Sequence, residues 1–230
     1  MPPTINKRRI ITLHNSKSPI SESYVKLRTN IELSAVDGPI QTILFTSANP
    51  GEGKSTTVAN LAVVFAQADK KVLIIDADLR KPTMHHFFSL SNRMGLTSVL
   101  TNRASLLDAT NTTAIPSLKV LTSGPIPPNP SELLGSKRME ALLQELRQQF
   151  DVILIDTPPS LAVADAQIMA KLVDGAVIVL HSGKVKREDG LKVKSNLELA
   201  KARILGVVLN NLDRKNMDSY YYYYYGESQE

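Results

Sequence analysis

Residues 42–56 read TILFTSANPGEGKST, and this stretch decides the fold. The apolar run TILFTSA at 42–48 predicts a short buried strand, and TTVANLAVVFAQA at 56–68 predicts a buried helix. The glycine-containing loop between them joins a strand to a helix, which is the setting that a phosphate-binding loop requires. The sequence from Ala48 to Ser55 matches that loop, except that Ala48 replaces its first glycine.

The residue types in this loop suit it to bind a nucleotide. Gly51 and Gly53 allow the backbone to turn its N–H groups toward phosphate oxygens, and the following helix adds its positive end. Lys54 can reach the β- and γ-phosphates, and Ser55 can ligate Mg²⁺. A glycine-rich turn formed by chance is the alternative, which the strand–loop–helix context disfavours. The nucleotide-binding residues predicted for the loop are Asn49, Gly51, Glu52, Gly53, Lys54, Ser55 and Thr56.

Two further motifs place carboxylates after apolar strands. LIIDAD at 73–78 contains Asp76 and Asp78, and ILIDTPP at 153–159 contains Asp156. Both motifs bring acids to the carboxyl edge of a parallel sheet, where ligands of open α/β folds bind. We therefore predict Asp156 as a Mg²⁺ residue and Asp76 as a second one. Asp78 is surplus to nucleotide binding, so it is either a base for an incoming hydroxyl or a cap for the following turn.

Apolar strands alternate with helical segments along the rest of the chain. This alternation predicts an α/β fold in which helices sandwich a parallel sheet, and with the phosphate loop it indicates a P-loop NTPase. Further strands are predicted at 71–78, 118–124, 151–159, 175–183 and 204–213, and helices at 21–35, 131–150, 164–173 and 187–202. Candidate helix caps are Ser21 or Ser23 for the first helix and Ser131 for the second, and Gly190 is expected to interrupt the last.

The chain divides into one domain with two tails. Residues 1–20 are polar, basic and rich in proline, and are expected to form an arm. Residues 21–213 form the predicted P-loop domain, and residues 214–230 form a tyrosine-rich tail. Six consecutive tyrosines, Tyr220, Tyr221, Tyr222, Tyr223, Tyr224 and Tyr225, cannot encode an alternating strand or a helical stripe. A low-complexity end is one interpretation of this tract.

Asn210-Asn211-Leu212-Asp213 follows the last predicted strand. It is similar to the Asn-Lys-x-Asp guanine motif but lacks the lysine, which favours ATP over GTP. Asn210 is a candidate contact to the nucleotide base, and a strand-end turn is the equally weighted alternative.

Composition excludes several classes of protein. The chain has no cysteine, so disulfides and thiolate metal sites are impossible, and this fits a reducing cytoplasm. No stretch approaches the roughly 20 apolar residues of a membrane span, and the N-terminus has no secretory signal. The net charge is +5, with basic residues concentrated near the N-terminus and at 184–203. These clusters are solvated surface, or they bind an anionic membrane leaflet or nucleic acid.

The motifs ANPGEGKST, LIIDADLRKP and VILIDTPP, in this order and spacing, resemble those of the bacterial protein-tyrosine kinases. More narrowly, the chain resembles the cytoplasmic kinase subunit of Gram-positive capsule or exopolysaccharide systems, and TSGPIPPNPSELL at 122–134 is also similar. The resemblance implies that Lys54 binds ATP phosphates in catalysis and that Ser55, Asp76 and Asp156 hold Mg²⁺. It implies that Asp78 is the base for the tyrosine hydroxyl.

The resemblance also accounts for the tail and implies partners. Tyr220–Tyr225 are the implied autophosphorylation sites. The implied partners are a transmembrane activator that recruits the kinase to the inner face of the plasma membrane, a protein-tyrosine phosphatase, and protein substrates with tyrosine. The family also forms rings of subunits through Glu-x-x-Arg-x-x-Arg on the first helix. Here Glu22 and Arg28 hold the outer positions, but Val25 replaces the middle arginine, which weakens the expectation of a homo-oligomeric ring.

A switch ATPase of the septum-site or plasmid-partition type (MinD/ParA-like) is the alternative, since it shares this branch of the fold and binds membrane or DNA. Its signature lysine is absent, because Asn49 stands at that position, and we expect no stable nucleic-acid binding. A third interpretation is a scaffold with a relic site, which the intact Lys54, Ser55, Asp76, Asp78 and Asp156 oppose.

Overall fold

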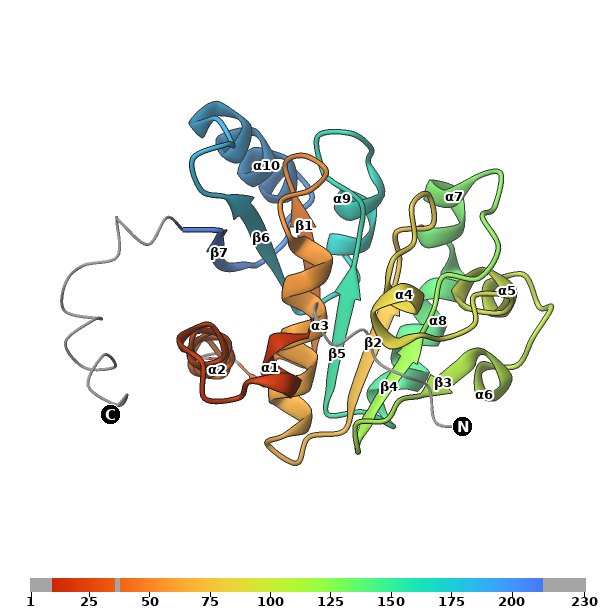
Figure 1. Ribbon diagram of the computed structural model, residues 1–230. Coiled ribbons are helices and arrows are strands. Elements are labelled where there is room, and N and C mark those ends of the chain that lie inside the picture. Colours follow the sequence, from red (N-terminus) through yellow and green to blue (C-terminus); the bar gives the residue numbers. More distant parts are fainter. Residues whose placement is uncertain (1–9, 36–37, 213–230) are drawn as a thin grey trace.

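The computed structural model describes residues 10–35 and 38–212, and a seven-stranded sheet forms its centre (Figure 1). The strand order is β3-β4-β2-β5-β1-β6-β7. Every pairing is parallel except that of β3 with β4, so the predicted parallel sheet is confirmed with one antiparallel edge. The strands are β1 Thr42–Ser47, β2 Val72–Asp76, β3 Thr110–Thr112, β4 Leu118–Leu121, β5 Val152–Asp156, β6 Gly175–His181 and β7 Ile204–Asn210.

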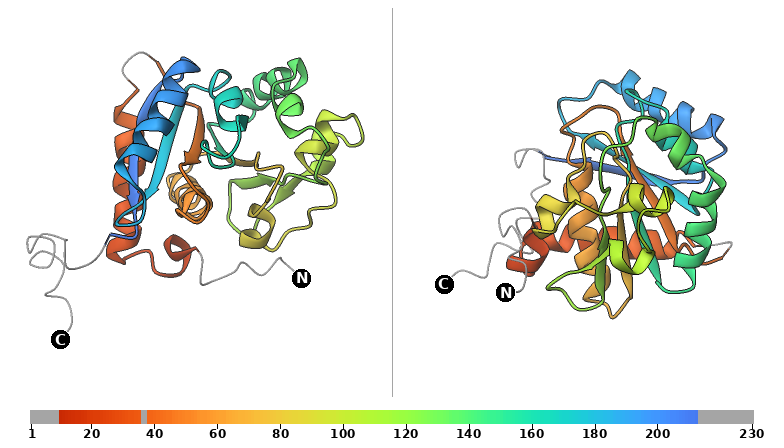
Figure 2. Two further views of the ribbon diagram at one scale, coloured as in Figure 1. Left: turned by 90° about the horizontal axis from the view of Figure 1, so that it is seen from above. Right: turned by 90° about the vertical axis from the view of Figure 1, so that its right-hand side faces the viewer.

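Helices cover both faces of this sheet, as expected (Figure 2). Successive side chains of a strand point to opposite faces, so β1 places Ile43 and Phe45 in one hydrophobic core and Leu44 in the other. The first core lies under α1 Ile11–His14, α2 Pro19–Leu33, α3 Lys54–Ala66 and α4 Met84–Phe88. The second lies under α5 Leu96–Leu100, α6 Leu106–Ala109, α7 Pro130–Leu134, α8 Lys137–Arg147, α9 Asp165–Ala170 and α10 Arg187–Leu199.

The first long helix begins earlier than expected. The sequence favoured Ser21 or Ser23 as its cap, but the cap is Ser18, whose side chain accepts a hydrogen bond from the Ser21 backbone N–H at 3.1 Å. Pro19 then takes the first helical position, where its missing N–H costs nothing. The Ser21 hydroxyl donates instead to the Asn15 carbonyl at 2.6 Å.

Two other local predictions are also corrected. The helix expected at 131–150 is broken, because Ser136 caps α8 by accepting from the Met139 N–H at 3.2 Å, and Ser131 caps neither half. The helix expected to be interrupted at Gly190 is continuous through that residue. A Cβ on Gly190 would lie 3.2 Å from a methyl carbon of Leu180, so the glycine lets α10 pack close to β6.

Part of the expected N-terminal arm belongs to the packed domain. Ile10 is fully buried, and the buried Thr12 hydroxyl and the Asn60 side chain of α3 are 3.0 Å apart. Ile10 and Thr12 therefore pack against the domain, while residues 1–9 and 213–230 lie outside the described residues. Within the described part of the chain, no helix has the length and apolar character needed to cross a membrane.

Candidate active site

The phosphate loop lies between the end of β1 and the start of α3, at the top of Figure 1. Gly51 and Gly53 have φ angles of +81° and +87°, which side-chain-bearing residues rarely adopt. Gly53 immediately precedes the first turn of α3, so the backbone of the loop lies next to the positive end of that helix. The sequence prediction of a loop joining a strand to a helix is confirmed.

The side chain of Glu52 supports the loop from within. Its carboxylate is 5% exposed and accepts hydrogen bonds from the Ala48 N–H at 3.0 Å and the Asn49 amide at 3.3 Å. Both partners belong to the loop itself. Sequence reasoning could not assign this role, because a glutamate within a polar loop is typically exposed to solvent.

Asn210 connects the end of β7 to the same loop. Its side-chain amide donates to the Glu52 carbonyl at 3.1 Å, and its side-chain oxygen accepts from the Asn211 N–H at 2.9 Å. A Cβ on Gly53 would lie only 1.7 Å from the Asn210 nitrogen, so the two residues are in close contact. This geometry is that of a strand-end turn that also braces the loop.

Lys54, Ser55 and Asp156 come together at the start of α3. The Lys54 ammonium group forms a buried ion pair with Asp156 Oδ1 and lies 3.2 Å from the Ser55 hydroxyl. Lys54 is 7% exposed and Asp156 is fully buried. Thr56 follows on the first turn of α3 and is partly buried, and its carbonyl accepts from the Asn60 side chain at 2.9 Å.

Asp76 and Asp156 stand side by side, because β2 and β5 pair with these two residues in register. Asp76 Oδ2 accepts from the Thr83 and Met84 N–H groups, both at 2.9 Å. Among the described residues, Asp76 Oδ1 and Asp156 Oδ2 have no hydrogen-bond partner. Burial raises the pKa of Asp76 to about 7, and the negative charge of Asp156 adds to this rise.

These oxygens fit a magnesium ion. Carboxylate and hydroxyl oxygens are the ligands that Mg²⁺ prefers, and it usually takes one or two carboxylates together with water and phosphate. The two orphaned oxygens and the Ser55 hydroxyl supply such a set. The structure offers no cluster of three or more acids or histidines in its described residues, so the phosphates and water would have to complete the coordination.

Asp78 lies two residues beyond Asp76 and is 8% exposed. Its Oδ1 accepts from the Arg80 N–H at 3.3 Å and the Lys81 N–H at 2.9 Å, so it closes the turn that follows β2. Both bonds end on Oδ1. Burial raises the pKa of Asp78, and the Lys81 hydrogen bond opposes that rise. Asp78 thus occupies the cap geometry, while its place at the sheet edge still suits a base.

Sequence reasoning missed a polar cluster beside Asp78. The Arg80 guanidinium forms two hydrogen bonds with the fully buried Asp165, and Ser131 donates to the same carboxylate at 2.6 Å. Arg80 lies within LIIDADLRKP and Ser131 within TSGPIPPNPSELL, so both stood in motifs that carry the family resemblance. Asp165 had no sequence signal of a functional role beyond its place in the helix predicted at 164–173.

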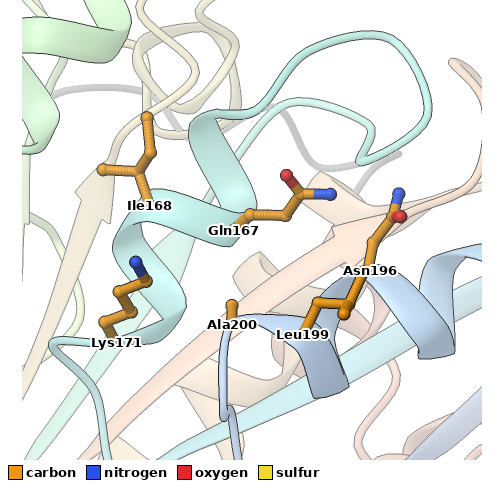
Figure 3. A pocket seen from close by; sticks show the side chains of 6 residues that line it. All are labelled: Gln167, Ile168, Lys171, Asn196, Leu199 and Ala200. Atoms are coloured by element: carbon orange, nitrogen blue, oxygen red, sulfur yellow. The ribbon is translucent and has the colours of Figure 1, made fainter.

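A surface pocket lies away from this chemistry. Figure 3 shows a pocket between α9 and α10, and all of its lining residues belong to these helices or their ends: Gln167, Ile168, Lys171, Asn196, Leu199 and Ala200. None of them is a candidate site residue. The carboxylate pair is the stronger candidate site, because it combines burial, orphaned oxygens and a phosphate loop.

Other predicted residues lie elsewhere. Val25 and Arg28 lie on α2, where Arg28 is 3.7 Å from Glu32 and donates to the Val64 carbonyl at 3.4 Å. The tyrosines at 220–225 fall outside the described residues.

Known proteins are similar to this chain both in sequence and in architecture. A family model of an AAA domain matches residues 40–193. The chain is 51% identical over 217 residues to the tyrosine-protein kinase YwqD of Bacillus subtilis, and the match covers 94% of this chain and 92% of YwqD. The crystal structure of the chimerical protein CapA2B2 has a TM-score of 0.87 and 44% identity, over 92% of this chain and 94% of that one.

A more distant structure defines the branch of the fold. The septum site-determining protein MinD of Pyrococcus horikoshii, complexed with Mg-ADP, has a TM-score of 0.64 and 27% identity, over 74% of this chain and 69% of that one. Together these similarities confirm the predicted P-loop NTPase fold of the MinD/ParA-like branch.

Proposed function

The chain belongs to the bacterial tyrosine-protein kinases, and from this premise we propose that it transfers phosphate from ATP to the tyrosines at 220–225 of its own sequence. The observation that carries the proposal is the buried cluster of Lys54, Ser55, Asp76 and Asp156 at the mouth of the phosphate loop. Phosphoryl transfer depends on positioning and charge neutralisation, and this cluster supplies a cation and metal-binding oxygens in one place.

We assign the residues the following roles. The loop N–H groups and Lys54 hold the phosphates of ATP, and Ser55, Asp76 and Asp156 hold Mg²⁺. When bound, the ion neutralises charge that develops on the phosphate oxygens. The tyrosine oxygen forms a bond to the γ-phosphorus while the bond to the leaving ADP oxygen breaks, and Asp78 accepts the hydroxyl proton. The raised pKa of Asp78 suits this role, because a base works best when its pKa lies nearer the working pH.

Asn210 is the proposed neighbour of the nucleotide base, and the missing lysine of the guanine motif supports ATP as the nucleotide. The side-chain amide of Asn210 already donates to the Glu52 carbonyl of the loop. Its contribution to base recognition would therefore be indirect: it holds the end of β7 against the loop.

Chain length permits transfer within one chain as well as between chains. The end of β7 and the end of β2 are separated by β6, β1 and β5, which corresponds to four strand spacings or about 19 Å. Tyr220 is ten residues beyond Asn210, so this stretch can span at most about 36 Å. We propose transfer between subunits, as the family resemblance implies, although Val25 removes one arginine expected at a subunit contact.

The proposed setting is capsule or exopolysaccharide synthesis. There the kinase works in the cytoplasm, is recruited to the inner face of the plasma membrane by a transmembrane activator, and acts on tyrosine-containing proteins. A protein-tyrosine phosphatase reverses the modification.

Intact mass measurement after incubation with ATP and Mg²⁺ tests the central proposal. We expect a ladder of single-phosphate increments confined to a C-terminal peptide that contains Tyr220–Tyr225. Lys54→Met should remove the ladder, since the charge that holds the β- and γ-phosphates is lost. Hydrolysis of ATP with no change of protein mass would instead support a MinD-like switch ATPase.

A further inference from the structure

Arg80, Ser131 and Asp165 form a compact polar cluster beside the active site. Arg80 Nε lies 2.9 Å from Asp165 Oδ2, and Arg80 Nη2 lies 3.1 Å from Asp165 Oδ1. Ser131 Oγ donates to Asp165 Oδ1 at 2.6 Å and accepts from Arg80 Nη2 at 3.0 Å. The Asp165 side chain is fully buried, so Arg80 and Ser131 supply the hydrogen bonds that solvent cannot.

The cluster joins three segments that are distant in the sequence. Arg80 lies in the turn after β2, Ser131 lies in α7 after the proline-rich segment 125–130, and Asp165 is the first residue of α9. The bidentate contact also fixes the plane of the guanidinium group, because both of its bonds end on one carboxylate.

The backbone of Arg80 links this cluster to Asp78. Asp78 Oδ1 accepts from the N–H of Arg80 and from that of Lys81. The same residue therefore touches the carboxylate of Asp78 through its main chain and the buried Asp165 through its side chain. Moving the Arg80 side chain would move the turn that orients the Asp78 carboxylate.

We propose that Arg80, anchored by Asp165 and Ser131, is a positioning residue that sets the Asp78 carboxylate for its contact with the acceptor tyrosine. This inference rests on the proposed role of Asp78 as the base. Arg80 contacts neither the metal-side carboxylates nor the phosphate loop in the hydrogen bonds described above, so its effect should fall on transfer and spare nucleotide binding. A misplacement of about 1 Å at a reacting group can cost on the order of 100-fold in rate.

The chain provides a matched control at the amino ends of the strands, opposite the carboxyl ends that carry the active site. Arg147 Nη1 and Nη2 contact Asp174 at 2.9 and 2.8 Å, and Nη2 also lies 2.7 Å from the Thr42 hydroxyl. This pair has the same bidentate chemistry, but Thr42 begins β1, so it lies at the amino edge of the sheet. A substitution there tests what the loss of a bidentate arginine does to stability alone.

Arg80→Lys keeps the positive charge but loses the planar guanidinium group that contacts both oxygens of Asp165. We expect it to lower the rate of tail phosphorylation by about 10- to 100-fold with ATP affinity changed by less than about threefold. Arg147→Lys should lower the melting temperature with no comparable change in that rate. Ser131→Ala removes one partner of the cluster and should give a smaller loss in the same direction, which keeps the test usable if Arg80→Lys folds poorly.

A double-mutant cycle distinguishes positioning from a general structural effect. In an Asp78→Asn background, Arg80→Lys should cause little further loss, because the group that it positions is no longer a base. An equal fractional loss in both backgrounds, or a parallel loss of ATP affinity, would overturn the proposal. If Asp78→Asn alone leaves the transfer rate unchanged, the proposed base is wrong, and that result is separate from any effect of Arg80.

Discussion

The contact between Gly53 and Asn210 makes the phosphate loop sensitive to a single methyl group. In Gly53→Ala, the new Cβ would lie 1.7 Å from the Asn210 amide nitrogen, and φ would remain near +87°. The side chain of Asn210 must then leave its place. Asn210 would then lose two hydrogen bonds: the one that its amide donates to the Glu52 carbonyl, and the one that its side-chain oxygen accepts from the Asn211 N–H.

The cost divides into two parts. An alanine in the left-handed region costs about 1–2 kcal/mol. Two lost hydrogen bonds cost about 1 kcal/mol each. Gly53→Ala should therefore lower the free energy of unfolding by about 3–4 kcal/mol. Gly51→Ala is the matched control: Gly51 has φ +81°, and apart from its chain neighbours no atom of the described residues lies within 4 Å of the Cβ that alanine would add, so only the conformational cost of about 1–2 kcal/mol remains.

A double mutant separates these parts. Asn210→Ala removes both hydrogen bonds and the steric conflict, so it should cost about 2 kcal/mol alone. Adding Gly53→Ala to it should then cost only the conformational part. The two single effects should therefore exceed the double effect by about 2 kcal/mol. Urea denaturation of the four proteins measures this difference. Additive effects would show that Gly53 and Asn210 are energetically independent and that the close approach does not govern the loop.

The remaining predictions concern the carboxylates and the tail. Asp78→Asn should keep ATP affinity within about tenfold and lower phosphotransfer by roughly 100-fold or more, whereas Asp156→Asn should raise the Mg²⁺ requirement; equal loss of ATP binding in both would contradict these roles. Asp76 has a folded pKa of about 7 against an ordinary value of 3.8, so the folded protein binds more protons between these values and loses stability as pH rises from about 4 to 7. Asp76→Asn should remove that loss, and denaturation curves at pH 4, 6 and 8 should then converge. Six phosphotyrosines would add about −9 to −12 charges against a net +5, so phosphorylation should shift any oligomer toward monomer in sedimentation, and a rate per molecule that is independent of dilution would refute transfer between subunits.

The parts of the site that the sequence could predict have strong local signals. Lys54 and Ser55 follow a recognisable loop, and Asp76 and Asp156 each end an apolar strand. Parallel strands share one carboxyl edge, so their proximity followed from the fold class. The Arg80 cluster has no such signal, because Arg80 and Asp165 are 85 residues apart and Ser131 and Asp165 are 34 apart.

Tertiary contacts and local caps also explain the elements of secondary structure that differ from the sequence predictions. β3 is the sequence TNT, which has no apolar residue, so only its pairing with β4 identifies it as a strand. The break before α8 depends on Ser136, since serine can either continue a helix or cap the next one. Gly190 weakens a helix in isolation, but its contact with Leu180 shows that close packing against β6 favours glycine there.

The register of the strands explains why the carboxylates meet the lysine. In β2, Ile74 faces the core under α3, and in β5, Leu154 faces the same core. Side chains alternate along a strand, so Asp76 and Asp156, each two residues further on, must face α3 as well. Lys54 begins that helix, and its ammonium group meets Asp156 there. A slip of one residue in β2 would turn Asp76 to the opposite face and leave its partner alone. The apolar residues that fix the register therefore also determine which side chains meet at the site.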